Sequence, residues 1–295
     1  MPPFQSLPPH QFTLAEKEEF IKCAMNPQHF IETYVHFYLK TGELSTVKLF
    51  PHQETMLKDV QAYPFNTFFK YRQAGCTTLA LAWMLHCMVF STDKEYVLAS
   101  CNLALSNSMM DTLRGIMGHL PRFLRPIPVV GHNSKRRILF ENGNYLSAVN
   151  ISSDGVRGSN PDLLIIDEFM YANKMDDFMV SVLGSLSVGA EVIAISGPRF
   201  GRESHRISTS SHVRCFQWYQ DPRYNQDLWW EQDIHGEHGN YIGTTKISNV
   251  PEAEHLTLLR KGYLPQSSWS QKLRKDVMSE EMASEYFNSD FYGHE

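Results

Sequence analysis

One stretch of the chain, residues 66–90, constrains the fold more than any other. It begins as an aromatic, β-prone run, passes through a polar turn that ends in Gly75, and continues as an apolar segment free of Gly and Pro. A strand, a glycine turn, a hydroxyl residue and a helix, in this order, can hold a nucleotide triphosphate through backbone N–H groups and the helix N-terminus. The stretch therefore predicts either a phosphate-binding loop or an ordinary strand-to-helix turn.

The turn departs from the usual G-x-x-x-x-G-K-[ST] pattern at two positions. Gly75 and Thr77 fit, but Cys76 occupies the lysine position and Lys70 occupies the position of the first glycine. A thiol cannot neutralise a γ-phosphate, so this turn is a weak signal by itself.

A second motif strengthens the nucleotide interpretation. Residues 163–168 read LLIIDE, an apolar run of the kind found in buried parallel strands, whose C-terminal ends carry ligand-contacting groups. We expect Asp167 to hold Mg²⁺ through water and Glu168 to polarise an attacking water molecule. The alternative is a strand capped by two solvated acids. The two motifs together predict a nucleoside triphosphatase.

The order of expected elements predicts an α/β fold with a mostly parallel central sheet flanked by helices. Strand-like runs at 95–100, 163–167 and 191–196 alternate with helix-like segments at 103–119 and 175–186. Residues 136–150 predict a β-hairpin around an Asn-Gly turn. An acidic residue directly after the expected metal-binding Asp favours the RecA-like P-loop class.

We expect two regions along the chain, a helical N-terminal part with the ATPase core at 1–212 and a small C-terminal lid subdomain at 213–295. Thr13 and Glu16 predict the start of a first helix through a capping box. Aromatic residues at helical spacing predict a second helix over residues 29–40. After residue 213 aromatic and polar residues mix, and a charged, helix-prone tail covers 271–291.

The overall composition limits the possible classes of protein. With a formal net charge of −5, the chain lacks the overall positive charge typical of proteins that bind nucleic acids tightly. Transient binding to DNA is compatible with this charge. Five scattered cysteines without C-x-x-C spacing fit a reducing compartment and argue against a zinc ribbon. We expect no signal peptide and no membrane span.

Three further residues are candidates by position. Gln53, one strand upstream of the turn, can read an adenine edge or can be an ordinary surface residue. Arg157 lies in a glycine-rich loop before the acidic strand and is either a mobile contact arginine or a solvated one. Ser196 ends a strand-like run and either senses the γ-phosphate or belongs to a turn.

Taken together, these motifs resemble the ATPase domain of the large terminase subunit of tailed bacteriophages, the motor that packs DNA into capsids. The resemblance covers about residues 26–202, and its segments read, in order, NPQHFIETY, FPHQ, YRQAGCTT, GVRGSNPDLLIIDE and ISGP. It implies ATP and Mg²⁺ as cofactors. It implies catalytic roles for Glu168, Lys70, Arg72 and Arg157, nucleotide contacts by Gln53, Gln73, Ala74, Gly75, Cys76, Thr77, Thr78 and Ser196, and metal binding by Thr77 and Asp167.

The resemblance also suggests which residue replaces the missing loop lysine. In lambda-like terminases the lysine stands at the start of the loop, five residues before the glycine, and Lys70 has that spacing from Gly75. Arg72 stands where the family's loop arginine is found. The sequence therefore looks like a hybrid in which Lys70 takes over the role of the lysine.

The partners implied by the resemblance are double-stranded DNA, a portal protein and a small terminase subunit. The implied assembly is a homo-oligomeric ring on the capsid, with a monomer in solution, and the implied location is the host cell cytoplasm at the portal vertex of the procapsid. Large terminases usually continue into an RNase H-like nuclease. No later acidic cluster suited to two metals follows here, so we expect ATPase but no nuclease activity from this chain.

Two other functions remain open at the level of sequence. A superfamily-two helicase also has a Gln motif and an acidic strand, but it needs a second RecA-like domain, for which the residues after 213 offer no motif. A non-hydrolysing nucleotide-binding scaffold would explain the missing loop lysine, whereas retention of Thr77, Asp167 and Glu168 argues against it.

Overall fold

The computed structural model describes residues 12–38, 43–46, 48–152, 158–197, 211–235 and 240–277. The chain divides into two compact units, and each is described by itself. The first unit consists of Met1–Phe68, Gly75–Ser196 and Gly201–Arg214. The second unit consists of Phe69–Ala74, Gly197–Phe200 and Cys215–Glu295.

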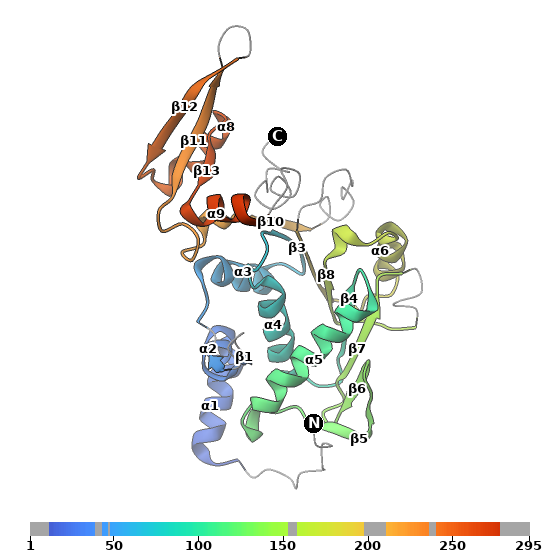
Figure 1. The fold of residues 1–295 in the computed structure, drawn as a ribbon. Helices are drawn as coiled ribbons and strands as arrows, with labels where there is room; N and C mark the ends of the chain where they lie inside the picture. The colour runs from blue at the N-terminus through green and yellow to red at the C-terminus, as the bar shows by residue number, and fades with distance from the viewer. Residues whose placement is uncertain are drawn as a thin grey trace. The chain divides into compact units, whose positions relative to one another are not determined.

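A large mixed sheet forms the centre of the first unit (Figure 1). Among the described residues it has eight strands in the order β10-β3-β9-β8-β4-β7-β6-β5. Their bounds are β3 Phe65–Lys70, β4 Glu95–Ser100, β5 Pro128–Asn133, β6 Arg137–Phe140, β7 Tyr145–Asn150, β8 Leu163–Asp167, β9 Glu191–Ser196 and β10 His212–Phe216. The pairs β4/β7, β4/β8 and β8/β9 are parallel, whereas β5/β6 and β6/β7 are antiparallel. This confirms the predicted α/β architecture.

Helices cover the parallel strands. Figure 1 shows α4 (Cys76–Phe90) and α5 (Leu103–His119) lying across the sheet, where α4 contacts β8 and β9 and α5 contacts β4 and β7. Every residue of β8 is buried, as expected for a strand covered on both faces. At the start of β9, Trp83 Nε1 donates to Glu191 Oε2 at 3.1 Å. Burial raises the pKa of the Glu191 carboxyl, and this hydrogen bond only partly opposes the shift.

The hairpin predicted around Asn142-Gly143 is present between β6 and β7. Gly143 has φ +80°, and a side chain there would overlap the Asp93 carboxylate, so the turn requires glycine. Strand β5 extends this part of the sheet and has no counterpart in the sequence-based prediction.

The N-terminal helices differ in part from the prediction. The first, α1 (Leu14–Met25), begins at the expected capping box, in which Thr13 Oγ1 accepts from the Glu16 N–H and Glu16 reaches back to the Thr13 N–H. The second, α2 (Pro27–Tyr34), ends earlier than predicted. Residues 36–38 instead form β1 (His36–Tyr38), which pairs antiparallel with β2 (Leu44–Thr46). The aromatic residues at 36–38 favour a strand, and pairing with β2 stabilises it. This preference outweighs the helical spacing of the aromatic residues in the sequence.

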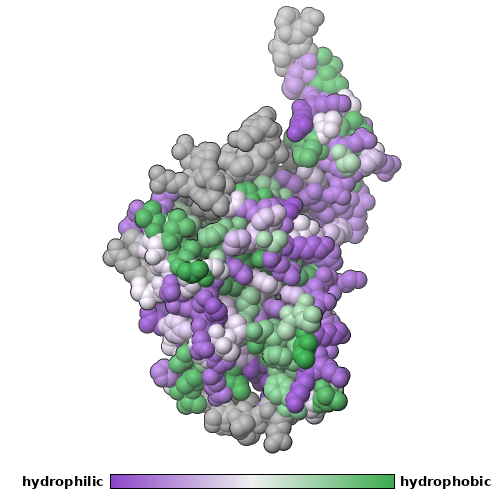
Figure 2. All heavy atoms as spheres, turned by 180° about the vertical axis from the view of Figure 1, so that it is seen from behind, coloured by the Kyte–Doolittle hydropathy of each residue, from purple (hydrophilic) through white to green (hydrophobic). Residues whose placement is uncertain are grey.

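Two further α-helices of the first unit adjoin strands β3 and β8 in the sequence. Helix α3 (Pro51–Ala62) precedes β3, and α6 (Met175–Leu183) follows β8. Val180 and Leu183 on α6 are 67% and 59% exposed. Figure 2 shows one face of the molecule, where hydrophobic and hydrophilic residues alternate in small patches. None of the helices that the structure describes is both long and apolar enough to span a membrane.

The second unit is built around a three-stranded antiparallel sheet with the order β12-β11-β13. Its elements are β11 (Trp229–His235), β12 (Tyr241–Ser248), α8 (His255–Arg260), β13 (Leu264–Gln266) and α9 (Ser268–Val277). Trp218 and Trp230 are almost fully buried and form its core. The predicted tail helix begins earlier, at Ser268, and its part beyond residue 277 lies outside the described residues. The role of this unit as a lid stays a prediction.

Candidate nucleotide-binding site

The site begins at the connection between β3 and α4. Gly75 directly precedes α4 and adopts a left-handed conformation, with φ 78° and ψ 11°. Glycine takes this conformation without steric cost, which explains why the sequence places it here. Within the described part of the chain, no side-chain hydrogen bond caps the helix at Gly75. The positive end of the α4 dipole lies at this glycine, where it can stabilise an anionic group.

Two of the predicted site residues meet directly. Thr77 Oγ1, in the first turn of α4, donates to Asp167 Oδ1, at the end of β8, over 2.9 Å. Asp167 is buried, with 8% of its surface exposed. A hydroxyl and a carboxylate from positions ninety residues apart therefore converge at the carboxyl end of the parallel strands.

Glu168 follows Asp167 in an unusual backbone conformation. Its φ of 52° and ψ of 42° lie in the left-handed region, which costs a non-glycine residue about 1–2 kcal/mol. The residue is half-buried and precedes a short 3₁₀ turn, Phe169–Tyr171. Strain of this kind is concentrated at functional sites. This residue thus connects the end of β8 at Asp167 to the 3₁₀ turn.

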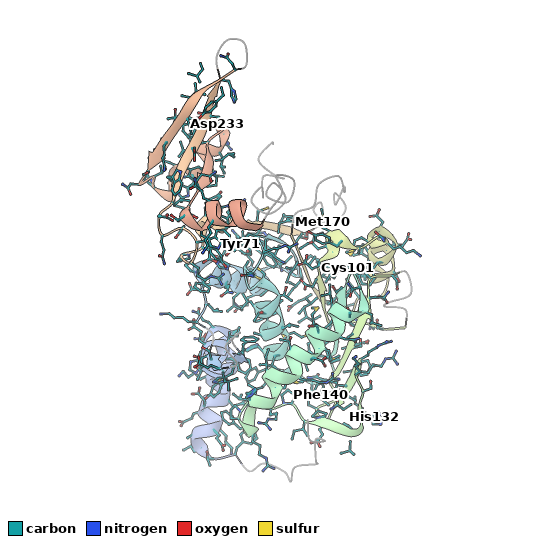
Figure 3. The ribbon with its side chains drawn as sticks, viewed as in Figure 1. Tyr71, Cys101, His132, Phe140, Met170 and Asp233 are labelled. Carbon is teal, nitrogen blue, oxygen red and sulfur yellow. The ribbon has the colours of Figure 1, made fainter. Side chains whose placement is uncertain are left out.

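Ser196 supports this turn. It is fully buried at the end of β9, and its Oγ accepts a hydrogen bond from the Met170 N–H at 3.3 Å. Figure 3 shows Met170 just beyond β8 and Cys101 just beyond β4, near the same end of the sheet. A direct contact between Ser196 and a nucleotide stays a prediction.

Ser100 is a residue that the sequence reasoning missed. It ends β4, is fully buried, and lies directly beside Asp167 in the parallel register of β4 and β8. Its Oγ has no hydrogen-bond partner among the described residues. A buried hydroxyl without a partner costs free energy, so it indicates a group or water that completes it. The polar residue at the end of an apolar run was the available signal.

Gln53 lies against the loop glycine. It is buried on α3, and its Oε1 accepts from the Phe50 N–H at 3.1 Å. A side chain at Gly75 would overlap the Gln53 Nε2 atom. The structure thus brings together the upstream Gln and the glycine turn, while adenine recognition by Gln53 stays a prediction.

The remaining predicted residues differ in their surroundings. Cys76 is 1% exposed at the start of α4, and Thr78 in the same turn is half-buried. Lys70 and the next loop residues belong to the second unit: Lys70 ends β3 and is half-buried, Arg72 and Gln73 are exposed, and Ala74 is buried. Gln73 has a left-handed φ of 64°. Arg157 lies outside the described residues.

The donor set around Asp167 suits Mg²⁺. The ion prefers oxygen ligands and keeps several waters, so one carboxylate and one hydroxyl suffice on the protein side. Asp167 and Thr77 would hold it, and the unpartnered Ser100 hydroxyl fits a hydrogen bond to such a water.

Another set of possible metal ligands, Glu19, Cys23 and His29, lies on α1 and α2. These side chains bind one another: Glu19 Oε1 is 2.6 Å from His29 Nε2 and 3.6 Å from Cys23 Sγ. Burial raises the pKa of the Cys23 thiol to about 12, so without a metal the thiol stays protonated and can donate to Glu19. The set therefore serves as a hydrogen-bonded connection between the two helices.

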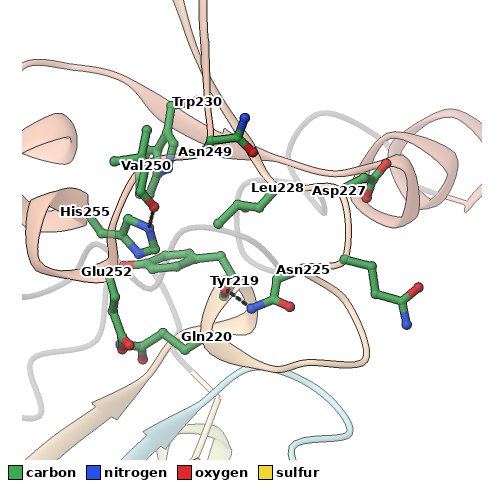
Figure 4. Close-up of a pocket in the computed structure, with 11 residues that line it drawn as sticks. Tyr219, Gln220, Asn225, Asp227, Leu228, Trp230, Asn249, Val250, Glu252 and His255 are labelled. Carbon is green, nitrogen blue, oxygen red and sulfur yellow. Dashed lines mark hydrogen bonds between the residues drawn. The ribbon is translucent and has the colours of Figure 1, made fainter.

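The second unit contains a cavity of about 360 Å³ (Figure 4). Tyr219, Trp230 and His255 line it. His255 Nε2 lies 3.2 Å from the Val250 carbonyl oxygen, and Asn225 Nδ2 donates to the Tyr219 carbonyl at 3.0 Å. None of the described residues that line this cavity was predicted from the nucleotide-binding motifs.

No protein-family model matches the chain. In its fold the chain is similar to the large terminase of bacteriophage HK97, with a TM-score of 0.51 and 15% identity, over 65% of this chain and 43% of that one. It is also similar to the large terminase ATPase domain of Thermus phage P74-26 (TM-score 0.43, 10% identity, 81% of this chain and 92% of that one). A third similar structure is the large terminase of a thermophilic bacteriophage in complex with ADP (TM-score 0.41, 14% identity, 65% and 45%).

The chain thus matches less than half of the length of the HK97 terminase. At 15% identity this likeness concerns the fold, and it confirms the predicted RecA-like core with its mostly parallel sheet.

Proposed function

We propose that this chain is an ATP-hydrolysing motor of the large-terminase kind, which drives double-stranded DNA into a viral procapsid. The observation that carries the proposal is the hydrogen bond of 2.9 Å between Thr77 and Asp167. It joins the hydroxyl after the glycine turn to the acid at the end of the apolar strand, as a Mg–nucleotide site requires. Glu168, next in the chain, supplies a base at the same place.

The residues divide the work as follows. The N-terminus of α4 and the loop around Gly75 bind the phosphates, with Thr77 and Asp167 on the Mg²⁺ side. When bound, Mg²⁺ neutralises charge that develops on the phosphate oxygens. Glu168 orients the attacking water and accepts its proton. Lys70 supplies the cation that Cys76 cannot.

The other predicted contacts extend this site. Arg72 orients the γ-phosphate, Gln53 reads the adenine edge, and Arg157 acts on the nucleotide of a neighbouring subunit. A scaffold without hydrolysis is the second candidate, because the buried thiol of Cys76 replaces the usual lysine. A helicase is the third candidate; it would need a second RecA-like core, and the described sheet of the second unit is small and antiparallel.

Translocation requires partners. We propose a ring of such chains docked on a portal protein at the portal vertex, in the host cell cytoplasm, with DNA delivered by a small terminase subunit. The net charge of −5 suits an intermittent grip on DNA, because permanent neutralisation of many phosphates would need a basic surface.

The test is ATP hydrolysis by the Glu168→Gln variant, with and without double-stranded DNA. The variant keeps the size of the side chain but cannot accept a proton, so it should bind ATP and lose about 10²–10⁴-fold in turnover. Glu141→Gln, an exposed acid in the same unit, is the matched control and should behave as wild type. Near wild-type turnover by Glu168→Gln contradicts the assignment of the base.

Measurements of ATP hydrolysis and nucleotide binding by the wild-type chain distinguish the motor from the scaffold. Hydrolysis stimulated by double-stranded DNA supports the motor, and nucleotide binding without hydrolysis under all conditions supports the scaffold. Plasmid DNA incubated with the chain and Mg²⁺ should stay intact, because the given sequence after residue 202 shows no acidic motif suited to two-metal chemistry. Metal-dependent cleavage would contradict that expectation.

A further inference from the structure

Asp221 is a fully buried carboxylate in the second unit, and it is surrounded by donors. The Arg223 side chain approaches it through Nε at 3.0 and 3.1 Å and through Nη2 at 2.5 Å. The Arg223 backbone N–H adds a hydrogen bond of 2.9 Å, and the Tyr71 hydroxyl donates a further one. This charged group thus has a full set of partners, as burial requires.

Arg223 reaches beyond Asp221 to the main chain of the loop. Its Nη2 also donates to the carbonyl oxygen of Gln73 at 3.1 Å. Gln73 is the residue with a left-handed φ of 64°, two positions before Gly75. The guanidinium therefore bridges a buried carboxylate and the strained backbone of the phosphate loop.

Aromatic rings support this bridge. Tyr71 meets Tyr224 edge to face at 6.0 Å between ring centroids, and Tyr224 stacks on Trp269 of α9 at 4.1 Å. The Arg223 guanidinium carbon lies 5.0 Å from the centroid of the Tyr224 ring. Figure 3 labels Tyr71 in the connection after β3. The Tyr224 ring thus contacts both Tyr71 and Arg223, and Trp269 of α9 packs against that ring.

The charges favour a persistent contact. Burial alone would raise the pKa of Asp221, but hydrogen bonds from Arg223 and Tyr71 outweigh it and lower the pKa. Burial and the hydrogen bond to Asp221 raise the pKa of the Tyr71 phenol, so that it stays a donor at neutral pH. Removing the Arg223 side chain leaves the Asp221 carboxylate buried with only the Tyr71 hydroxyl and the Arg223 backbone N–H as donors, which is unfavourable.

We propose that Asp221 and Arg223 are positioning residues, which hold the first half of the phosphate loop in its nucleotide-binding conformation through Tyr71 and the Gln73 carbonyl. The part of this inference that concerns ATP rests on the proposed function. The loop is thereby tied to the turn at residues 218–225, so nucleotide binding and the order of that turn stabilise each other.

The experiment compares Arg223→Ala with Lys246→Ala, which removes another cation of the second unit, placed 3.9 Å from the Trp229 ring centroid and without a hydrogen bond to the loop. Hydrogen–deuterium exchange is measured on peptides covering residues 71–76. The affinity for a fluorescent ATP analogue, KM and kcat are measured on the same samples. In Arg223→Ala, loop exchange should rise about 10-fold or more, and affinity should fall about 10–100-fold.

KM should rise by a similar factor, while kcat at saturating ATP stays within a few-fold, because Arg223 positions the loop and does not touch the reacting atoms. Arg223→Lys keeps the charge but lacks the forked donors, so it should recover only part of the loop protection. Exchange in the Lys246→Ala control should equal that of wild type.

Wild-type exchange of residues 71–76 in Arg223→Ala overturns the proposal. If that variant does not fold, Tyr71→Phe decides by the same measurement, with Tyr241→Phe as the matched loss of an exposed hydroxyl. Loop exchange is independent of catalysis. If wild type binds no ATP, the proposed function fails, whereas the exchange data still decide whether Asp221 and Arg223 hold the loop.

Discussion

Substituting Gly75 by Ala should disturb the site in two separable ways. The first is conformational, because φ at this position is +78° and an L-residue resists it. The second is steric, because the added methyl group overlaps the Gln53 Nε2 atom. The Nε2 atom lies at the end of the flexible Gln53 side chain, so this amide can move away. The amide then loses the hydrogen bond that its Oε1 accepts from the Phe50 N–H.

The expected cost follows from these two contributions. A left-handed non-glycine residue costs about 1–2 kcal/mol. Loss of the hydrogen bond to Gln53 adds about 0.5–1.5 kcal/mol. Gly75→Ala should therefore lower the free energy of unfolding by about 1.5–3.5 kcal/mol. ATP binding should weaken as well, because the phosphate loop and Gln53 both shift.

Two glycines of the same unit provide matched controls. Gly131 has φ +82° and no heavy atom within 4 Å of an added methyl group, so Gly131→Ala should show the conformational cost alone. Gly115 lies inside α5 with open space around it, so Gly115→Ala should stabilise by up to about 1 kcal/mol. Urea unfolding followed by circular dichroism gives the free energies, and titration with an ATP analogue gives the affinities.

A double-mutant cycle isolates the steric contribution. In Gly75→Ala combined with Gln53→Ala, the overlap is gone and the hydrogen bond is lost only once. The double variant should therefore cost less than the sum of the single ones by about 0.5–1.5 kcal/mol. Strict additivity, together with equal costs at Gly75 and Gly131, would refute the packing of Gln53 against the loop.

Three further predictions concern other residues. Lys70→Ala should abolish ATP hydrolysis, whereas Cys76→Ala should leave it almost unchanged. Combining Lys70→Ala with Cys76→Lys should restore part of the hydrolysis. Normal hydrolysis by Lys70→Ala would disprove the hypothesis that Lys70 replaces the loop lysine. Arg157→Ala mixed with Glu168→Gln should regain part of the activity if the arginine acts on a neighbour's nucleotide, and no rescue in a co-assembled mixture argues against this. Glu191→Gln should raise the free energy of unfolding near pH 7 and have no such effect below the pKa of about 4.5 for an unfolded Glu; an unchanged urea midpoint at pH 7 contradicts this.

The sign of the Glu191 prediction comes from its raised pKa. Burial disfavours the charged carboxylate in the folded state, so the folded protein holds the proton more tightly than the unfolded chain. Stability from this group is complete below the unfolded pKa and is lost as the pH rises through the folded pKa. The amide of Gln avoids this loss and can still accept the hydrogen bond from Trp83.

The predicted site residues that the structure brings together lie at the ends of regular elements. Thr77 and Asp167 stand at the start of a helix and the end of a strand, where local patterns determine both the element and the direction of its terminus. Their meeting then follows from the parallel arrangement of the strands. The hairpin at Asn142-Gly143 was predictable for the same local reason.

Long-range contacts were out of reach. The hydrogen bond from Arg223 to Gln73 joins residues 150 positions apart. Gln73 belongs to the loop motif, but no sequence pattern pointed to Arg223. The predicted helix over residues 29–40 ends at Tyr34, because pairing between β1 and β2 decided the conformation of residues 36–38. Ser100 could be recognised as a site residue only from the strand register that places it beside Asp167.

That register has a consequence for how this chain can change in length. Side chains of a strand point alternately to opposite faces, so the orientation of Asp167 depends on whether the number of residues before it in β8 is odd or even. Inserting one residue would turn the carboxylate to the other face of the sheet, away from Thr77. Inserting two would restore the face but move the carboxylate along the strand by about 7 Å. Natural insertions and deletions should therefore be confined to the loops before and after β8. The number of residues in the strand itself, which pairs with β4 and β9, should stay constant.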